Sequence, residues 1–299
     1  MTFTPDKVSI VLPVYNGERF LRGAIDSCLS QTHRSLELIV VDDCSTDSTP
    51  QIVRSYTDPR LVYVRNETNQ RLPRSLNIGF GRATGDYLTW TSDDNEYEPT
   101  AIERMLEFLK KDRDADFVCA DYWAWDEKSG VKKRVEIPER LDLKNKCEVG
   151  GCFLYTRRVW QEIGPYDPRY EMVEDYDYWM RISRRFQMQR LAEPLYLYRY
   201  HSESLTARRG YIQEIWDRVL RYRHGFIGWQ ELGWAVLYNL ENIEKSNEPA
   251  PATRQLMRQT WKRFWVLSPF FFWAAASAVR YCALRRWVRR VSGKEKAER

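Results

Sequence analysis

The sequence has few of the residues that crosslink small proteins or bind zinc. Its 299 residues include six cysteines and three histidines, with no CxxC pair and no neighbouring pair of histidines. This spacing argues against a zinc site, and we expect a reduced, cytosolic compartment rather than a disulfide-bonded secreted protein. The N-terminus lacks a basic segment followed by an apolar one, so we expect no secretory signal peptide.

Several common catalytic motifs are also missing. There is no GxxxxGK[ST] phosphate loop and no GxSxG nucleophile elbow. The run Gly79–Gly85 is similar to a dinucleotide fingerprint, but its spacing is GxGxxxG and it follows a predicted helix instead of a strand. The sequence therefore gives no support to a P-loop enzyme, a dinucleotide-dependent enzyme or a serine hydrolase.

No apolar run is long enough to span a bilayer. Residues 264–279 form an uncharged stretch of 16 residues that contains Pro269, whereas a spanning helix needs about 20. Residues 252–299 carry 12 Lys and Arg against two Glu, while the rest of the chain has a net charge of −5. This basic, aromatic tail favours peripheral attachment to an anionic membrane surface. The alternative is a hydrophobic helix packed on the body of the protein.

The composition is that of a folded protein, with 43% hydrophobic, 30% charged and 14% aromatic residues. Up to residue 121, apolar runs alternate with segments of helical periodicity. Strands are predicted at 8–14, 36–41, 61–64, 87–91 and 117–120, and helices at 18–31, 46–56, 73–83 and 99–111. This alternation predicts an α/β fold with a mostly parallel sheet covered by helices on both faces.

Beyond residue 121 the pattern is less regular. Residues 126–145 are charged and rich in turn residues, which indicates a surface excursion, and 195–200 is expected to be an edge or hairpin strand. A strand is also predicted at 149–156, and helices at 158–163, 175–186, 211–242 and 253–267.

Pairs of acidic residues follow two of the predicted strands. Asp42 and Asp43 come after the second strand, and Asp93 and Asp94 after the fourth. Because the carboxyl ends of parallel strands border the ligand crevice, both pairs are expected at one site. Carboxylates suit Mg²⁺ or Mn²⁺, which complete their coordination with water and phosphate. The alternative, that each Asp only caps the next helix, is weakened by the presence of two such pairs.

A second acidic cluster, Glu171, Glu174, Asp175 and Asp177, lies at and just before the start of the predicted helix 175–186 and has helical spacing. At these spacings like charges are neighbours, which favours a raised pKa of the kind that a general base uses. The alternative is a solvated helix N-terminus, where acids are favourable. His201 follows the last predicted strand, and taken alone it is more often structural than functional.

Four stretches in this order resemble the family 2 glycosyltransferases. They cover about residues 7–206 and read VSIVLPVYNGERFLRGAIDSCLSQTHRSLELIVVDDCSTDST, SLNIGFGRATGDYLTWTSDDN, GPYDPRYEMVEDYDYWMRI and YRYHSESLT. The resemblance implies a GT-A fold and an inverting enzyme that uses a nucleotide-sugar donor.

The resemblance also assigns roles to residues. It places the loop of Pro13, Val14, Tyr15 and Glu18 beside the nucleotide, Asp43 on the base, and Arg71, with Arg74, in a segment that often touches the nucleotide. The metal motif is here Asp93-Asp94-Asn95, with Asp93 near the ribose and Asp94 on a Mn²⁺ or Mg²⁺ ion. Asp175 is the expected base, and His201 is expected beside the diphosphate or the metal.

These roles imply a transfer reaction. The metal stabilises the departing nucleoside diphosphate, and the base takes the proton of an acceptor hydroxyl as that hydroxyl attacks C1. We expect a UDP-sugar donor first, a glycan or lipid-linked acceptor, and a role in bacterial surface-polysaccharide synthesis at the cytoplasmic face of the membrane.

The resemblance implies a division into domains. Residues 1–206 are expected to form the GT-A catalytic domain, with a nucleotide-binding half over about 1–121 and an acceptor half over about 122–206. Residues 207–299 are expected to form a helical C-terminal region that is membrane-associated from about residue 253.

Two other function classes are weighed against this one. A nucleotide-sugar-binding protein without transfer activity is disfavoured by the intact set Asp43, Asp94, Asp175 and His201. A nucleic-acid-binding protein that uses the basic tail is disfavoured by the tail's uncharged core of Phe, Trp and Ala, and no nucleic-acid partner is expected.

The tail leads to a testable prediction. We expect the full-length protein to sediment with anionic liposomes at low salt and to be released at high salt, since each basic residue near an anionic leaflet contributes on the order of 1 kcal/mol. Protein that stays in the supernatant at low salt would contradict peripheral attachment. Extraction that needs detergent even at high salt and alkaline pH would point to an embedded segment instead.

Overall fold

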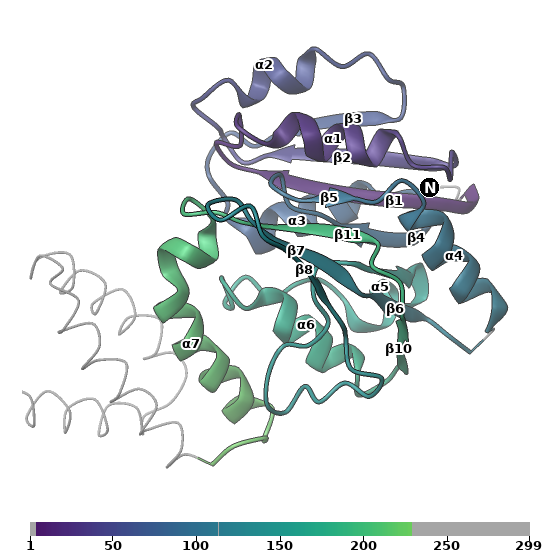
Figure 1. The fold of residues 1–299 in the computed structure, drawn as a ribbon, viewed down its shortest axis with the longest axis vertical. Helices are drawn as coiled ribbons and strands as arrows, with labels where there is room; N and C mark the ends of the chain where they lie inside the picture. Colours follow the sequence, from purple (N-terminus) through teal and green to yellow (C-terminus); the bar gives the residue numbers. More distant parts are fainter. Residues whose placement is uncertain (1–3, 113, 229–299) are drawn as a thin grey trace, which may run out of the picture. The chain divides into compact units, whose positions relative to one another are not determined.

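The computed structural model describes residues 4–112 and 114–228, and Figure 1 shows their arrangement. The strands are β1 (Thr4–Val14), β2 (Leu36–Asp42), β3 (Leu61–Arg65), β4 (Gly85–Trp90), β5 (Glu96–Tyr97), β6 (Phe117–Ala120), β7 (Tyr122–Asp126), β8 (Lys132–Val135), β9 (Phe153–Thr156), β10 (Met188–Leu191) and β11 (Tyr196–Tyr200). The helices are α1 (Leu21–Leu29), α2 (Thr49–Arg54), α3 (Leu72–Arg82), α4 (Ala101–Lys111), α5 (Arg157–Ile163), α6 (Glu174–Ile182) and α7 (Leu205–Arg223).

The chain divides into two compact units, Met1–Gln213 and Glu214–Arg299. The apolar run 264–279, the basic tail, the predicted helix 253–267 and the end of the predicted helix 211–242 lie outside the described residues. No helix of the described part is both long enough and apolar enough to span a bilayer.

A seven-stranded sheet forms the centre of the first unit. Its strand order is β10-β6-β9-β4-β1-β2-β3, and every neighbouring pair is parallel except those made by β9. All seven residues of β2 are buried, as expected for a strand covered on both faces. The predicted α/β architecture with a mostly parallel sheet is confirmed.

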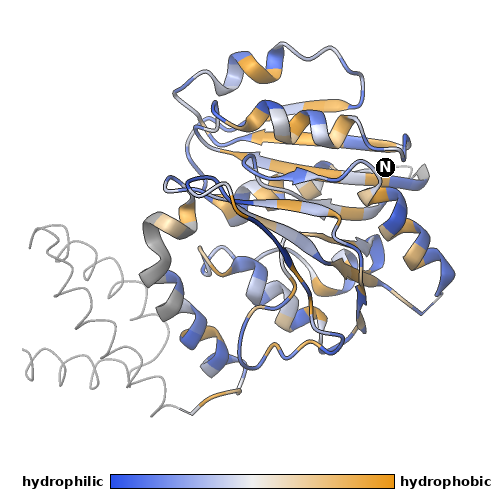
Figure 2. Ribbon diagram, viewed as in Figure 1, coloured by the Kyte–Doolittle hydropathy of each residue, from blue (hydrophilic) through white to orange (hydrophobic). Residues whose placement is uncertain are grey.

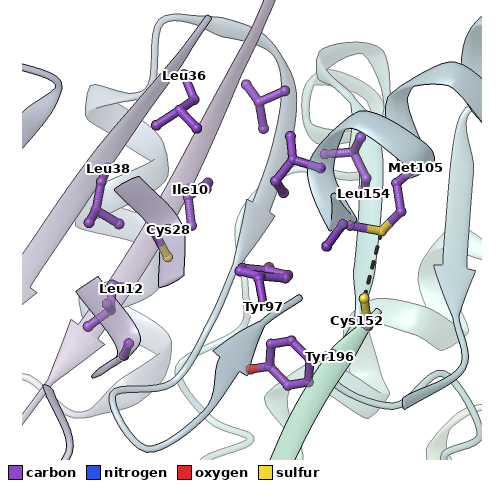
Figure 3. Close-up of a cluster of buried hydrophobic side chains, with 14 of the residues drawn as sticks. Ile10, Leu12, Cys28, Leu36, Leu38, Tyr97, Met105, Cys152, Leu154 and Tyr196 are labelled. Carbon is purple, nitrogen blue, oxygen red and sulfur yellow. Dashed lines mark hydrogen bonds between the residues drawn. The ribbon is translucent and has the colours of Figure 1, made fainter. Parts of the chain in front are cut away.

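Alternate residues of the strands determine which helices cover each face. Ile10 and Leu12 of β1 belong to a cluster that also contains buried residues of α1, α2 and α4 (Figure 3). The intervening Val11 lies against Gly79 of α3, where an added Cβ would be only 2.3 Å from a Val11 methyl. Apolar residues run along both the strands and the covering helices (Figure 2). The core therefore has two layers, one on each side of the sheet.

A second sheet has four strands in the order β5-β11-β7-β8. The prediction that 195–200 is an edge or hairpin strand is wrong, because β11 lies between β5 and β7 and is parallel to β7. Residues 126–145 are largely exposed, as predicted, but they include β8, which pairs with β7, and the buried residues Ile137 and Leu143. The charged segment Lys132–Val135 is mostly exposed, so it lacks the apolar alternation that identifies a half-buried strand.

Hydrogen bonds to Glu37 join β1, β2 and the start of β4 at the edge of the sheet where these strands begin. The Glu37 carboxylate accepts bonds from Lys7 Nζ (2.8 Å), Ser9 Oγ (2.6 Å) and the backbone N–H of Thr84 (2.6 Å). Burial alone would raise the pKa of Glu37, but these donors outweigh it and lower the pKa below its ordinary value.

We predict that Glu37→Gln lowers the free energy of unfolding by about 2 kcal/mol at pH 7, because hydrogen bonds to a buried charge are lost. Since the folded protein holds the pKa of Glu37 low, its contribution is complete above the ordinary pKa of about 4.3 and disappears at lower pH. Urea unfolding of both proteins from pH 7 to pH 3 tests this. The exposed Glu107→Gln serves as control and should change stability by less than about 0.5 kcal/mol.

Candidate active site

Three loops meet at the carboxyl ends of β1, β2 and β4. The first two are held together by short hydrogen bonds: Asn16 N–H donates to Ser45 Oγ (2.9 Å), and Asn16 Oδ1 accepts from Thr46 N–H (2.8 Å). Glu18, one of the predicted nucleotide-binding residues, accepts from the backbone N–H of Ser48 (2.9 Å). Its carboxylate therefore has a structural role in joining the loops.

The two members of the acidic pair at the end of β2 are both buried, and they differ in their hydrogen bonds. Asp42 is fully buried and accepts a hydrogen bond from the Tyr63 hydroxyl (2.7 Å). Asp43 accepts at Oδ1 from Asn66 (2.8 Å) and at Oδ2 from the backbone N–H of Arg71 (2.8 Å). Each carboxylate oxygen has two lone pairs, so Oδ2 of Asp43 keeps capacity for a further donor such as a base N–H.

The remaining predicted nucleotide contacts lie in different environments. Pro13 is buried within β1, opposite Val41 of β2, and Tyr15 is 52% exposed at the end of that strand. Arg71 directly precedes α3 with a φ of 71°, and its guanidinium lies 3.5 Å from Glu171 Oε1. Arg71 thus connects Asp43, which its backbone N–H contacts, with Glu171 in the acidic segment before α6.

Asp93 contacts the loop after β1. A Cβ on Gly17 would lie 2.0 Å from Asp93 Oδ2, so only glycine allows the two loops to approach this closely. Burial raises the pKa of Asp93 to about 8, and the negative charge of Asp94 adds to this effect. The acidic loop after β4 is therefore an environment that favours cations or protons.

The two predicted metal ligands lie side by side. His201 Nε2 is 3.0 Å from Asp94 Oδ2, and the His201 side chain is only 6% exposed. The other polar atom of each side chain, Asp94 Oδ1 and His201 Nδ1, is buried without a hydrogen-bond partner. Buried polar atoms are normally satisfied, and a carboxylate beside an imidazole is a donor set that divalent cations accept.

Antiparallel pairing between β5 and β11 produces this juxtaposition, because β5 directly follows the acidic loop and His201 directly follows β11. Asn95, the third residue of the motif, accepts from the backbone N–H of Arg199 (2.8 Å) and donates to Ser92 Oγ (3.1 Å). Within the part of the chain that the structure describes, no three His, Cys, Asp or Glu side chains converge on a metal position.

The second acidic cluster is largely buried at the start of α6, so the alternative of a solvated helix end is wrong. Burial, together with the charge of Asp175, raises the pKa of Glu174 to about 8. The half-buried Asp175 has its pKa raised to about 6, again by burial. Asp177 forms an ion pair with Arg181 at 2.8 Å. Asp175 is therefore the acid of this cluster that combines a raised pKa with a residue that is only half-buried.

The chain is similar to proteins of one known family. Residues 9–164, just over half of the chain, match the family model described as glycosyl transferase family 2. The chain belongs to this family. It is 35% identical over 189 residues to the uncharacterized glycosyltransferase RP339 of Rickettsia prowazekii, a match that covers 59% of this chain and 58% of the relative. The chain therefore matches less than two thirds of that relative's length.

Solved structures support the GT-A fold of this chain. The TarS fragment 1–349 from S. aureus, in complex with UDP, aligns with a TM-score of 0.58 at 18% identity, covering 78% of this chain and 70% of TarS 1–349. The mannosyltransferase PcManGT from Pyrobaculum calidifontis, in complex with GDP-Man and Mn²⁺, aligns with a TM-score of 0.57 at 16% identity. The alignment covers 94% of this chain and 87% of the PcManGT chain.

The sequence did not reveal two residues that hold the acidic loop in place. Arg199 contacts Asp94, and Phe20 contacts His201. From the sequence, Arg199 was predicted only to lie in a strand and Phe20 only to lie in a helix. One signal was available: alternation along β11 puts Arg199 on the same side of the strand as His201 two residues later.

The contact between Gly17 and Asp93 predicts that Gly17→Ala lowers kcat/KM for donor turnover by about 100-fold, the effect of a displacement of about 1 Å at a catalytic site. The added methyl would overlap both Asp93 and Val14. Gly81→Ala is the matched control, because a Cβ there meets nothing within 4 Å. It should keep activity and gain up to about 1 kcal/mol in helix stability. Equal activity in both variants would contradict the prediction.

Proposed function

We propose that this glycosyltransferase transfers a sugar from a nucleoside diphosphate donor to a hydroxyl group of a glycan or lipid-linked acceptor, with inversion at the anomeric carbon. The observation that carries the proposal is the Asp94–His201 pair with its two buried, unpartnered atoms. We expect uridine as the base, since TarS was solved with UDP, and guanosine as the alternative, since PcManGT was solved with GDP-Man.

Asp94 and His201 would hold a divalent cation, Mn²⁺ or Mg²⁺, with water and phosphate oxygens as the remaining ligands. When bound, the cation acts as a Lewis acid that stabilises the charge on the diphosphate leaving group. The Mn²⁺ in PcManGT supports this choice. Asp93 lies next to Asp94 and is proposed to face the ribose, while Asp43 receives the base N–H.

Asp175 is the proposed general base. The acceptor oxygen attacks C1 of the sugar, the bond from C1 to the diphosphate oxygen breaks, and the hydroxyl proton moves to the Asp175 carboxylate. A pKa near 6 keeps Asp175 ionised at neutral pH and still basic enough to accept a proton. Glu174, whose pKa is higher, is mostly protonated at the same pH.

The proposed setting is the cytoplasmic face of the cell membrane, where the enzyme would take part in bacterial surface-polysaccharide synthesis. The support is the basic, aromatic composition of residues 253–299, which lie outside the described residues.

A thermal-shift panel of UDP- and GDP-sugars with and without Mn²⁺ tests the donor and the metal together. We expect one donor class to raise Tm in the presence of Mn²⁺, because binding to the folded state stabilises it. Asp94→Asn should keep the fold and lose the Mn²⁺-dependent part of the shift, whereas the exposed Asp114→Asn should behave as wild type. A wild-type shift in Asp94→Asn would remove Asp94 from the metal site.

Asp175→Asn should retain the donor-induced shift and lose transfer by at least about 100-fold, the typical contribution of a general base. In the wild type, kcat should rise with pH to a plateau, with its half-maximum near pH 6, because only the carboxylate accepts the proton. Transfer that persists near wild-type rates in the variant would place the base elsewhere, with Glu174 and Asp177 next to be tested.

A further inference from the structure

Arg199 is a charged residue held in an unusually closed environment beside the acidic loop. The residue is 9% exposed. Its guanidinium carbon lies 4.4 Å from the centre of the Trp125 ring and 4.8 Å from the centre of the Phe20 ring. Cation–π contacts of this kind fix the plane of a guanidinium as well as stabilising its charge.

The polar contacts of the same guanidinium are directed at the acidic loop and the strand that follows it. Nε donates to the backbone carbonyl of Asp94 (3.0 Å), and Nη2 donates to Glu96 Oε1 (2.7 Å). The Arg199 side chain therefore holds both the main chain of Asp94 and the side chain of Glu96.

The Phe20 ring extends this arrangement to the second predicted ligand. It packs edge-on against the His201 imidazole, with ring centres 4.8 Å apart and planes at 63°. Phe20 thus has Arg199 as one neighbour and His201 as another. Since Nδ1 of His201 has no hydrogen-bond partner, ring packing and the single bond to Asp94 are the contacts that orient this imidazole among the described residues.

We propose that Arg199 is a positioning residue for the cation site. Through Nε it holds the backbone of Asp94, and through Phe20 it limits the rotation of His201, so that both side chains keep the orientation in which they would bind the cation. This inference rests on the proposed function, because it assigns a role to Arg199 in the metal site proposed above.

The arrangement requires arginine rather than a positive charge alone. Lysine could keep an ion pair with Glu96, but it has no planar group to lie between two rings and cannot donate in two directions from a rigid fork. Partners that orient metal ligands typically affect metal affinity by about 10- to 100-fold. Arg199→Lys should therefore lose most of this contribution while keeping the charge.

The test is Mn²⁺ binding in the presence of UDP, or of GDP if the donor panel selects it, followed by the electron paramagnetic resonance signal of free Mn²⁺. The proteins are the full-length wild type, Arg199→Lys and Arg199→Ala. Arg190→Ala is the matched control, because Arg190 also forms a buried ion pair, with Asp121 at 2.8 Å, but on β10, three strands from β4.

We expect both Arg199 variants to need about 10- to 100-fold more Mn²⁺ for half-saturation, and Arg190→Ala to bind Mn²⁺ as the wild type does even if its Tm falls. Nucleotide affinity without metal should not change in Arg199→Lys, which separates positioning of the cation site from a general loss of structure. Wild-type Mn²⁺ affinity in Arg199→Lys would overturn this inference and leave the proposed function intact. A wild-type protein that binds no Mn²⁺ with either nucleotide would overturn both.

Discussion

Parallel alignment of β1 with β2 and β4 places the ends of these three strands at one edge of the sheet, and the acidic loops of the candidate site depend on it. Asp43 and Asp93 come from strands on opposite sides of β1 and reach the same region because their registers with β1 are fixed. A one-residue slip of β4 would turn its side chains to the other face of the sheet. The two-layered core that specifies this register is therefore also what specifies the site.

The site concentrates acidic side chains whose charged form is disfavoured. The pKa values of Asp93 and Glu174 are both raised to about 8, in each case by burial first and then by a neighbouring acid. Such groups destabilise the folded protein at neutral pH unless a cation or a proton is bound. At the opposite edge, Glu37 has basic and polar donors and its pKa is lowered. The two ends of one sheet thus differ: the Glu37 carboxylate is stabilised by internal donors, whereas the acids at the other end have raised pKa values.

The sequence was informative where local patterns determine position. Asp43 and Asp94 follow apolar runs of strand length, so the rule that parallel strands end together was enough to place them. It was less informative where contacts join distant segments. Asn95 reads as part of a metal motif, but its side chain bonds the backbone of Arg199, and only the pairing of β5 with β11 reveals this. Short or charged strands such as β8 and β10 also carry no periodic signal, because their neighbours and not their own residues determine their burial.

The Asp94–His201 contact joins residues that are 107 positions apart in the chain. During synthesis at about 5–20 residues per second, Asp94 is added to the chain roughly 5 to 20 seconds before its partner. Strands β1, β2 and β3 have their neighbours early, but the acidic loop acquires β11, Arg199 and His201 only when most of the first unit has been translated. The contact between Asp94 and His201 is therefore completed late in synthesis, so the cation site proposed above would form only after nearly all of the first unit has been made.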